Sequence, residues 1–309
     1  MARHHPNPIS EAMAQGTPVP TDLLGDLTDC TSQVDQANIL RQRLAEDGYL
    51  FLRGVVPRDQ AMAARQEVFQ RLSEVGEIQE PALSGIATGT SHRKTRCKDL
   101  GSFWQSVCTG AALREATHGA QMEATMSMLL DEPATAHDFL FLRPGRPGVS
   151  TRLHYDFPFF ARGSQRIYTA WLALGDITIR EGPLMIAEGS NAFEDLIEPI
   201  RKIDYESSSS PNVQIMEDTV KFIRNRHSRF LTGDFRAGDL IVFDMFTLHG
   251  TFDNCSPDNR VRLSCDVRWQ PTSDPVDPRY RGDHPAGTTG AGYGELNGAK
   301  PLTEDWHAR

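Results

Sequence analysis

Two histidines and one aspartate are the residues of this chain whose types and spacing best suit metal chemistry. His154 and Asp156 are two positions apart within residues 151–156, and residues i and i+2 of a β-strand point to the same face of a sheet. His249 follows the apolar residues 240–248, which have the composition of a strand. A neighbouring strand would therefore deliver a second imidazole to the same point. Two imidazoles and one carboxylate on one face of an octahedral ion leave three positions open, the arrangement of non-haem Fe(II) oxygenases.

Short strands separated by turn residues surround these three side chains and predict the fold. The expected strands are residues 139–142, 151–156, 167–174, 183–187, the run that leads to His249, and 261–269. Short, evenly spaced strands with turn signals between them are typical of a double-stranded β-helix, a jelly roll of the cupin type. Because helical segments precede these strands, the predicted fold class is mainly β with flanking α-helices around a jelly-roll core.

The helices are predicted by apolar residues that recur every three or four positions. Such spacing occurs in residues 34–46, in residues 57–74 and in residues 111–130, each of which we expect to be one helix. Gly48 stands where the first helix should end, because glycine readily adopts the left-handed conformation that closes a helix. Residues 49–53, directly after it, are expected to form a strand.

The chain is expected to form one domain behind a short tail. The tail, poorly ordered and carrying His4 and His5, spans residues 1–20, and the domain spans 21–309, with N-terminal helices within about 34–130, a jelly-roll core at about 138–270 and a C-terminal tail at 271–309. In residues 192–232 the strand pattern lapses into an insertion that includes Ser207 to Ser210 and a basic stretch. Long insertions in compact domains are often functional covers, so this segment is a candidate substrate lid.

Composition argues against several classes of partner. The chain has 309 residues and a formal charge of −9, which disfavours nucleic acid because its binding relies on Lys and Arg that neutralise phosphates. No apolar stretch is long enough for a signal peptide or a membrane span, so no membrane partner is expected. The five cysteines form no C-x-x-C pair, which favours reduced thiols and a cytoplasmic location.

Four stretches, taken in order, resemble the phytanoyl-CoA dioxygenase family of Fe(II)/2-oxoglutarate oxygenases. They are residues 47–57, the His154-Tyr155-Asp156 motif, residues 168–176 together with 181–191, and the segment that begins at His249. Ordered agreement of this kind is more specific than any single motif. The resemblance implies Fe(II) as cofactor, held by His154, Asp156 and His249, with 2-oxoglutarate as co-substrate and O2 as oxidant.

The resemblance also implies a fixed cation for the distal carboxylate of 2-oxoglutarate. Arg260, eleven residues after His249, occupies the position of the family's arginine, and a guanidinium binds a carboxylate through two charge-assisted hydrogen bonds. Arg262 lies on the same face of the expected strand and is the alternative, with Ser264 as a hydroxyl partner. Trp171 matches a family position near the co-substrate, and a tryptophan packed in the core is an equally good interpretation.

The reaction that the resemblance implies is oxidation of an unactivated C–H bond of a small molecule, with decarboxylation of 2-oxoglutarate to succinate and CO2. Halogenating relatives lack the carboxylate that Asp156 provides here. We therefore expect hydroxylation first, with desaturation and ring closure as variants, in a setting such as natural-product biosynthesis. The resemblance does not imply an acyl-CoA substrate.

Substrate charge and two other function classes stay open at this level. Residues 139–175 contain one acid, Asp156, and five arginines: Arg143, Arg146, Arg152, Arg162 and Arg166. An excess of one charge around a cleft can steer an anionic substrate, or the arginines lie on the outward faces of strands. The alternative functions are a jelly-roll protein that binds a ligand without turnover and a cupin-type metalloenzyme that does not use 2-oxoglutarate.

Overall fold

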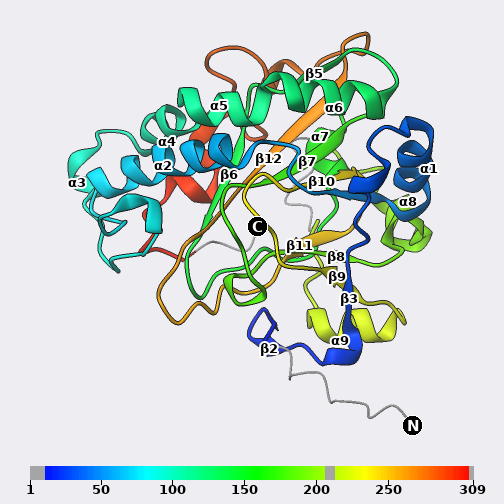
Figure 1. The fold of residues 1–309 in the computed structure, drawn as a ribbon, viewed down its shortest axis with the longest axis horizontal. Coiled ribbons are helices and arrows are strands. Elements are labelled where there is room, and N and C mark those ends of the chain that lie inside the picture. The colour runs from blue at the N-terminus through cyan, green and yellow to red at the C-terminus, as the bar shows by residue number, and fades with distance from the viewer. Residues whose placement is uncertain (1–10, 206–212, 306–309) are drawn as a thin grey trace.

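The computed structural model describes residues 11–205 and 213–305, which form two main β-sheets, with helices over the larger one, and a separate two-stranded hairpin (Figure 1). The helices are α1 (Ala37–Asp47), α2 (Arg58–Glu74), α3 (Arg93–Arg96), α4 (Leu100–Cys108), α5 (Ala111–His118), α6 (Ala120–Leu130), α7 (Phe157–Phe160), α8 (Glu194–Ile200) and α9 (Thr219–Asn225). The strands are β1 (Met13–Ala14), β2 (Thr17–Pro18), β3 (Leu24–Asp26), β4 (Tyr49–Leu52), β5 (Ala134–Ala136), β6 (Phe141–Gly145), β7 (Tyr168–Ala173), β8 (Leu184–Ala187), β9 (Phe230–Thr232), β10 (Leu240–Asp244), β11 (His249–Thr251) and β12 (Arg262–Pro271). Within these described residues, no helix has the length and apolar character needed to cross a membrane.

The two sheets form the jelly roll that the strand pattern predicts. The larger sheet has the strand order β4-β10-β7-β12-β5, and β6 also pairs with β12. The smaller sheet has the order β11-β8-β9-β3, in which only the β3–β9 pair is parallel among the pairings of described strands. A buried apolar cluster that contains Trp171 and Phe243 of the larger sheet and Ile186 of the smaller one fills the space between the sheets. The predicted fold class is confirmed.

Side-chain alternation along the strands of the larger sheet sends every second residue to the inside. In β7, Trp171 and Ala173 belong to the inner cluster, whereas Ala170 and Leu172 belong to the cluster beneath the helices. This is the two-residue period of a strand that is buried on both faces. In β12 the side chains that face the helices are apolar, and those that face the space between the sheets are polar.

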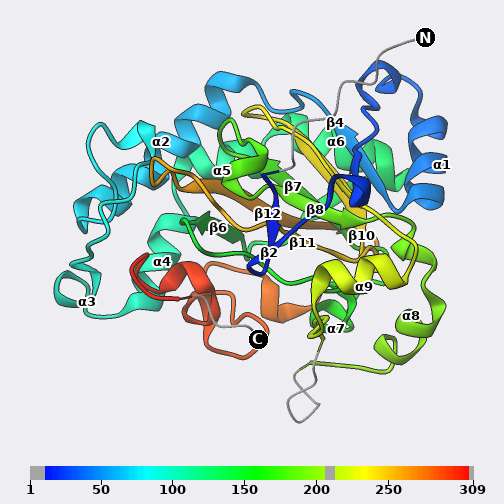
Figure 2. The same cartoon turned by 90° about the horizontal axis from the view of Figure 1, so that it is seen from below.

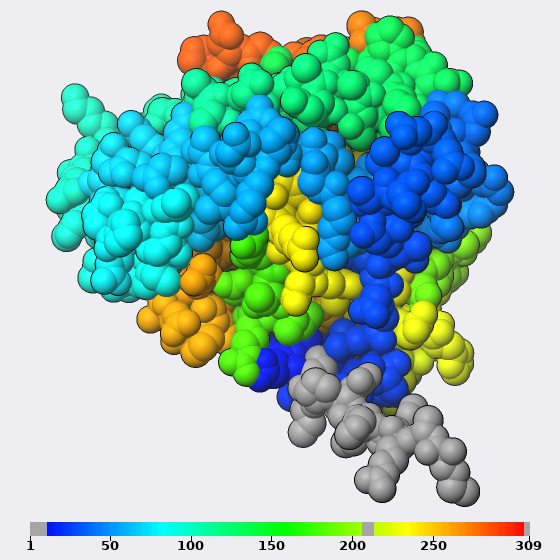
Figure 3. Space-filling view, in the orientation of Figure 1, coloured from blue at the N-terminus to red at the C-terminus, as the bar shows by residue number. Residues whose placement is uncertain are grey.

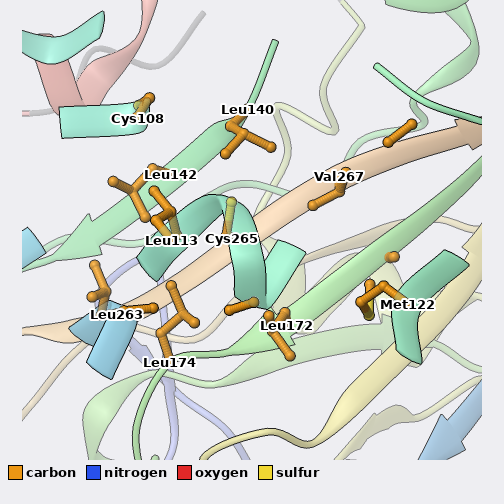
Figure 4. Packing of buried hydrophobic residues seen from close by; sticks show 14 of the residues in the cluster. Cys108, Leu113, Met122, Leu140, Leu142, Leu172, Leu174, Leu263, Cys265 and Val267 are labelled. Carbon is orange, nitrogen blue, oxygen red and sulfur yellow. The ribbon is translucent and has the colours of Figure 1, made fainter. Parts of the chain in front are cut away.

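Helices cover the outer face of the larger sheet. Figure 4 shows Leu172 and Cys265 of the sheet and Leu113 of α5 among the buried side chains of one apolar cluster. In the space-filling view the N-terminal helices make a continuous surface across the upper part of the molecule (Figure 3). Gly48 ends α1 in the left-handed conformation, with φ of 78°, as the sequence predicts. This helical layer holds the sheet that carries most of the site.

The single helix expected over residues 111–130 is wrong, because the chain breaks into α5 and α6 at Gly119. A Cβ at Gly119 would lie 2.3 Å from the carbonyl oxygen of Glu115, so the break needs a glycine. The break changes which residues face the core. Met122 and Met126 are fully buried in α6, whereas one unbroken helix would have placed a different set of side chains inward.

Residues 11–20 do not form the poorly ordered tail expected for residues 1–20. Strands β1 and β2 make a hairpin, and Ala12, Ala14 and Val19 are buried against the smaller sheet's outer cluster. The remaining part of that tail, with His4 and His5, lies outside the described residues. So do Ser207 to Ser210 of the insertion.

The insertion at 192–232 contains more regular structure than the sequence pattern predicts. It includes α8, α9 and β9, and Phe222, Ile223 and Phe230 are buried in the cluster outside the smaller sheet. The basic residues of α9 therefore sit on a helix with apolar anchors. A role of the insertion as a substrate cover stays a prediction.

Candidate active site

The three predicted metal ligands converge at one end of the space between the sheets. One donor atom from each of His154, Asp156 and His249 lies within 4.8 Å of the other two, and all three residues are buried. Nε2 of His154 is 3.8 Å and Nε2 of His249 is 3.9 Å from Oδ1 of Asp156. One ion placed between these atoms can contact all three.

His154 does not lie in a continuous strand as expected for residues 151–156. It forms an isolated antiparallel bridge with His249, in which each backbone N–H donates to the other residue's carbonyl, at 2.9 Å and 3.1 Å. Asp156 already has helical backbone angles and precedes α7. The two histidines are thus adjacent across a strand pairing, and the turn into α7 brings the carboxylate beside them.

Backbone carbonyls fix the tautomer of both imidazoles. Nδ1 of His154 lies 2.9 Å from the carbonyl oxygen of Arg152, and Nδ1 of His249 lies 3.0 Å from that of Thr247. Because a carbonyl only accepts, each Nδ1 carries the hydrogen, and each Nε2 lone pair faces Asp156 and the space for an ion. This is the usual arrangement of histidines that bind a metal.

The carboxylate of Asp156 is held by its other oxygen. Oδ2 accepts hydrogen bonds from Thr169 Oγ1 at 2.6 Å and from Arg268 Nη2 at 2.8 Å. Oδ1 consequently remains for a metal, as one ligand atom rather than two. The guanidinium of Arg268 lies over the rings of Phe141 and Phe160, at 4.2 Å and 4.7 Å from their centres, which fixes its position.

The protonation states favour cation binding. Burial lowers the pKa of His154 to about 3, with His249 acting in the same direction, so the imidazole is neutral near pH 7. Burial also lowers the pKa of His249. Burial alone would raise the pKa of Asp156, but Arg268 and the two histidines outweigh it and hold that pKa well below its usual range. Two neutral imidazoles and one carboxylate are a donor set suited to Fe(II).

Two cavities meet at these ligands. The larger has a volume of about 430 Å³ and contains His154 and Asp156 in its wall. The second is a narrow recess whose wall contains His154, His249 and Trp171. His154, Arg143 and Thr151 border both cavities. A metal-bound co-substrate and a separate substrate would therefore have adjoining places.

The structure brings Arg262, Ser264 and Trp171 to this region. Arg262 is 3% exposed and lines the recess, and its Nη1 donates to Ser264 Oγ at 2.9 Å. Trp171 is buried and lines the same recess. Burial lowers the pKa of Arg262 to about 10, partly offset by Asp266, so the side chain is still charged near pH 7.

Arg260 is not brought to the recess. Its side chain is 43% exposed, its Nε lies 3.1 Å from Glu181 Oε1, and it lines a surface hollow with Ser256. Arg260 is bridged to Ile86 just before β12 begins, so it lies beyond the end of the strand. Within the described residues, the recess wall contains Arg262 and Arg143 as its arginines.

Three residues of the site were not anticipated from the sequence. Thr169 and Arg268 hold Asp156, and Asp266 forms an ion pair at 3.1 Å in the recess wall with Arg143, one of the five arginines considered above. Arg268 and Asp266 continue the inward row of β12 that starts at Arg262 and Ser264. The two-residue period of that strand was therefore a signal that could have found them.

The C-terminal segment closes part of the larger cavity. Thr288, Leu296, Asn297 and Asp305 contribute to its wall. Figure 2 shows this segment, in orange to red, beside β6 and α4. Gln15 of the N-terminal hairpin lines the same cavity. Segments from both ends of the described chain thus shape the space in front of the ligands.

A family model and several known proteins match this chain. Residues 44–262 match the model of the family described as Phytanoyl-CoA dioxygenase (PhyH). The chain belongs to this family. It is also 26% identical, over 267 residues, to a 1-deoxypentalenic acid 11-beta-hydroxylase of Streptomyces arenae, a match that covers 82% of this chain and 88% of the relative.

Two solved structures share the fold of this family member. The epimerase SnoN, in complex with Fe3+, alpha-ketoglutarate and nogalamycin RO, is 19% identical with a TM-score of 0.52, over 81% of this chain and 87% of SnoN. EctD from S. alaskensis in its apo form is 16% identical with a TM-score of 0.52, over 87% of each chain. At these identities the likeness shows the fold.

Family membership and the metal-ligand geometry together define the enzyme class. The chain is an Fe(II)/2-oxoglutarate-dependent oxygenase, with iron as cofactor, and 2-oxoglutarate and O2 as co-substrates. The family resemblance inferred from the sequence is confirmed, and so are these cofactors. A cytoplasmic location stays a prediction.

Proposed function

We propose that this chain hydroxylates a small, largely apolar molecule that carries an anionic group, as in natural-product biosynthesis. The observation that carries the proposal is the pair of cavities that meet at His154. The recess contains a buried arginine suited to 2-oxoglutarate, and the larger cavity has room for an organic substrate beside the metal ligands.

Arg262 supports the recess as the 2-oxoglutarate site. It is buried, and within residues 11–205 and 213–305 it forms no ion pair with a carboxylate; its hydrogen bond goes to the neutral hydroxyl of Ser264. A buried charge without a counter-ion is costly. The distal carboxylate of 2-oxoglutarate would supply the missing partner, with a planar guanidinium able to donate two parallel hydrogen bonds. We therefore assign this role to Arg262 rather than to Arg260.

The residues of the chain have separate tasks in this scheme. Bound Fe(II) and 2-oxoglutarate supply the O2 activation and C–H oxidation. His154 and His249 hold the ion through Nε2, and Asp156 holds it through Oδ1. Trp171 and Leu184 line the recess and exclude water from it. Arg262 and Ser264 orient the co-substrate by its far end.

The wall of the larger cavity matches a substrate with an apolar body and an anionic group. Phe141, Phe159 and Phe160 provide aromatic surface close to the metal ligands, and Arg152 provides positive charge. A volume of about 430 Å³ lies within the range of small-molecule sites, which is roughly 300–1,000 Å³. The relative named a 1-deoxypentalenic acid 11-beta-hydroxylase acts, by its name, on an acid.

Anaerobic addition of Fe(II) and 2-oxoglutarate tests the proposal. The expected result is a weak visible metal-to-ligand charge-transfer band, which requires both to bind at one centre. A substrate screen that measures succinate release should then identify acids that stimulate turnover. Iron binding without the band would favour a cupin-type enzyme that does not use 2-oxoglutarate. A band without stimulated succinate release by any acid in the screen would count against an anionic substrate.

A further inference from the structure

The larger cavity contains one arginine whose charge has no partner among the described residues. Arg152 is partly buried and lines this cavity, and its guanidinium has no hydrogen-bond or ion-pair partner within the described chain. It immediately precedes Leu153 and His154, and its own carbonyl accepts the Nδ1 hydrogen of His154. The backbone carbonyl that orients the His154 imidazole therefore belongs to the residue whose side chain lines the cavity.

The other charged groups of the cavity wall already have partners. Arg268 is paired with Asp156 at 2.8 Å, and Arg143 with Asp266 at 3.1 Å. Asp305 is paired at 2.6 Å with an arginine outside the wall, Arg146. Because each of these charges is neutralised locally, Arg152 is the cation of the described cavity wall that is available to a ligand.

We propose that Arg152 binds the carboxylate of an apolar carboxylic-acid substrate and so determines which molecules enter the larger cavity. The inference rests on the proposed function, since it names the substrate class of the same site. One guanidinium forms a two-pronged pair with one carboxylate. A phosphate dianion would call for a second unpaired cation, and the described wall offers none. The aromatic surface of Phe141, Phe159 and Phe160 would receive the carbon skeleton next to the metal ligands.

Arg152 is separated from the co-substrate site by its position. It lines the larger cavity, whereas the recess wall contains Arg262 and Arg143 but not Arg152. Loss of the Arg152 charge should therefore weaken an acidic substrate and leave 2-oxoglutarate binding unchanged. A residue that binds the substrate would change only the affinity for the acid, whereas a residue that supports the fold would change both affinities.

The test uses two rigid probes of nearly equal size, adamantane-1-carboxylate and adamantane-1-carboxamide. Each is titrated calorimetrically, without oxygen, into full-length protein saturated with Fe(II) and 2-oxoglutarate. The visible charge-transfer band shows whether 2-oxoglutarate stays bound. Wild-type protein should bind the acid roughly ten- to hundred-fold more tightly than the amide, the range that one charge-assisted hydrogen bond gives.

Three variants complete the design. Arg152→Gln should bring the affinity for the acid to that for the amide, with the amide unchanged, and Arg152→Lys should keep part of the preference because it retains charge without the planar fork. Arg166→Gln is the matched control, since Arg166 belongs to the same stretch of arginines but pairs with Glu132 and Asp274 away from the cavity. It should keep the full preference.

Several results would overturn the inference. In Arg152→Gln, these results are an unchanged preference for the acid or a loss of 2-oxoglutarate binding. In the wild-type protein, the result is that neither probe binds at millimolar concentration. If Arg166→Gln also lost the preference for the acid, the preference would come from general charge steering and not from a local contact. Absence of the charge-transfer band with the acid preference intact would refute the proposed function while leaving the Arg152 subsite in place.

Discussion

Replacement of Arg262 by Met should weaken 2-oxoglutarate strongly without destabilising the ligand-free protein. Burial lowers the pKa of Arg262 to about 10, and each pKa unit corresponds to about 1.4 kcal/mol. The ligand-free fold therefore bears a cost on the order of a few kcal/mol for this charge. A bound carboxylate offsets that cost, and one charge-assisted hydrogen bond is worth about 1.5–3 kcal/mol net. The Kd for 2-oxoglutarate should consequently rise about ten- to hundred-fold.

The same substitution should leave the stability of the ligand-free protein unchanged or increase it. Met keeps much of the side-chain volume and removes a buried charge that has no counter-ion in the described chain. Replacing buried charges by apolar side chains of similar volume is often neutral or stabilising. The free energy of unfolding of Arg262→Met, measured in urea without ligand, should therefore equal or exceed that of the wild type. Anaerobic titrations of the charge-transfer band give the Kd.

Arg260→Met is the matched control. The Arg260 side chain is 43% exposed and paired with Glu181, and a surface ion pair of this kind contributes about 0–1 kcal/mol. Its Kd for 2-oxoglutarate should stay within a few-fold of the wild type. A large loss of affinity in Arg260→Met, with little change in Arg262→Met, would refute the reasoning and return the role to Arg260. Arg262→Lys should restore binding only in part, because ammonium lacks the planar fork.

Three further predictions concern the metal and pH. His154→Ala and His249→Ala should each abolish succinate formation while the far-ultraviolet circular dichroism stays that of the wild type; near-normal turnover with full iron occupancy would contradict the assignment. Arg268→Gln should weaken Fe(II) about 10- to 100-fold, the usual effect of removing a residue that holds a metal ligand, as measured by metal titration; unchanged affinity would mean that Asp156 is held without it. Burial lowers the pKa of His137 to about 4, below the unfolded value of about 6.5. Between these pH values the unfolded chain binds more protons than the folded one. The free energy of unfolding should therefore fall as the pH drops from about 6.5 to 4. His137→Phe should reduce that slope in urea titrations, and an unchanged slope would rule out this residue as its source.

The three metal ligands were predicted from residue types, strand period and the family pattern, but the structure brings them together by a different route. His154 pairs with His249 in an isolated long-range bridge, and Asp156 joins them from the turn into α7 instead of from a strand face. The end of α1 at Gly48 was predicted by a local rule, since it depends on one residue's backbone freedom. Features that follow from the conformational range of one glycine are thus readable without the fold.

The choice between Arg260 and Arg262 could not be read from the sequence, because both would face the same way on the expected strand, whereas in the structure β12 begins at Arg262 and Arg260 lies before it. Where the strand begins depends on its register with other strands. In the structure Arg262 is opposite Gly145 of β6, and a Cβ at Gly145 would lie 2.7 Å from Arg262 Nη2. A glycine in a partner strand therefore leaves the space in which this guanidinium is buried.

The inner row of β12 explains why the two cavities have separate charges. Arg262, Ser264, Asp266 and Arg268 all face inward, at a spacing of roughly 6.6 Å per two residues. Arg268 reaches Asp156 at one end, Asp266 neutralises Arg143 in the middle, and Arg262, at the other end, forms no ion pair with any described residue. Together with Arg152, the described walls then hold one unpaired guanidinium in each cavity. That arrangement suits the proposed binding of two different acids beside one metal ion, because a carboxylate pairs best with a cation that no other group has already neutralised.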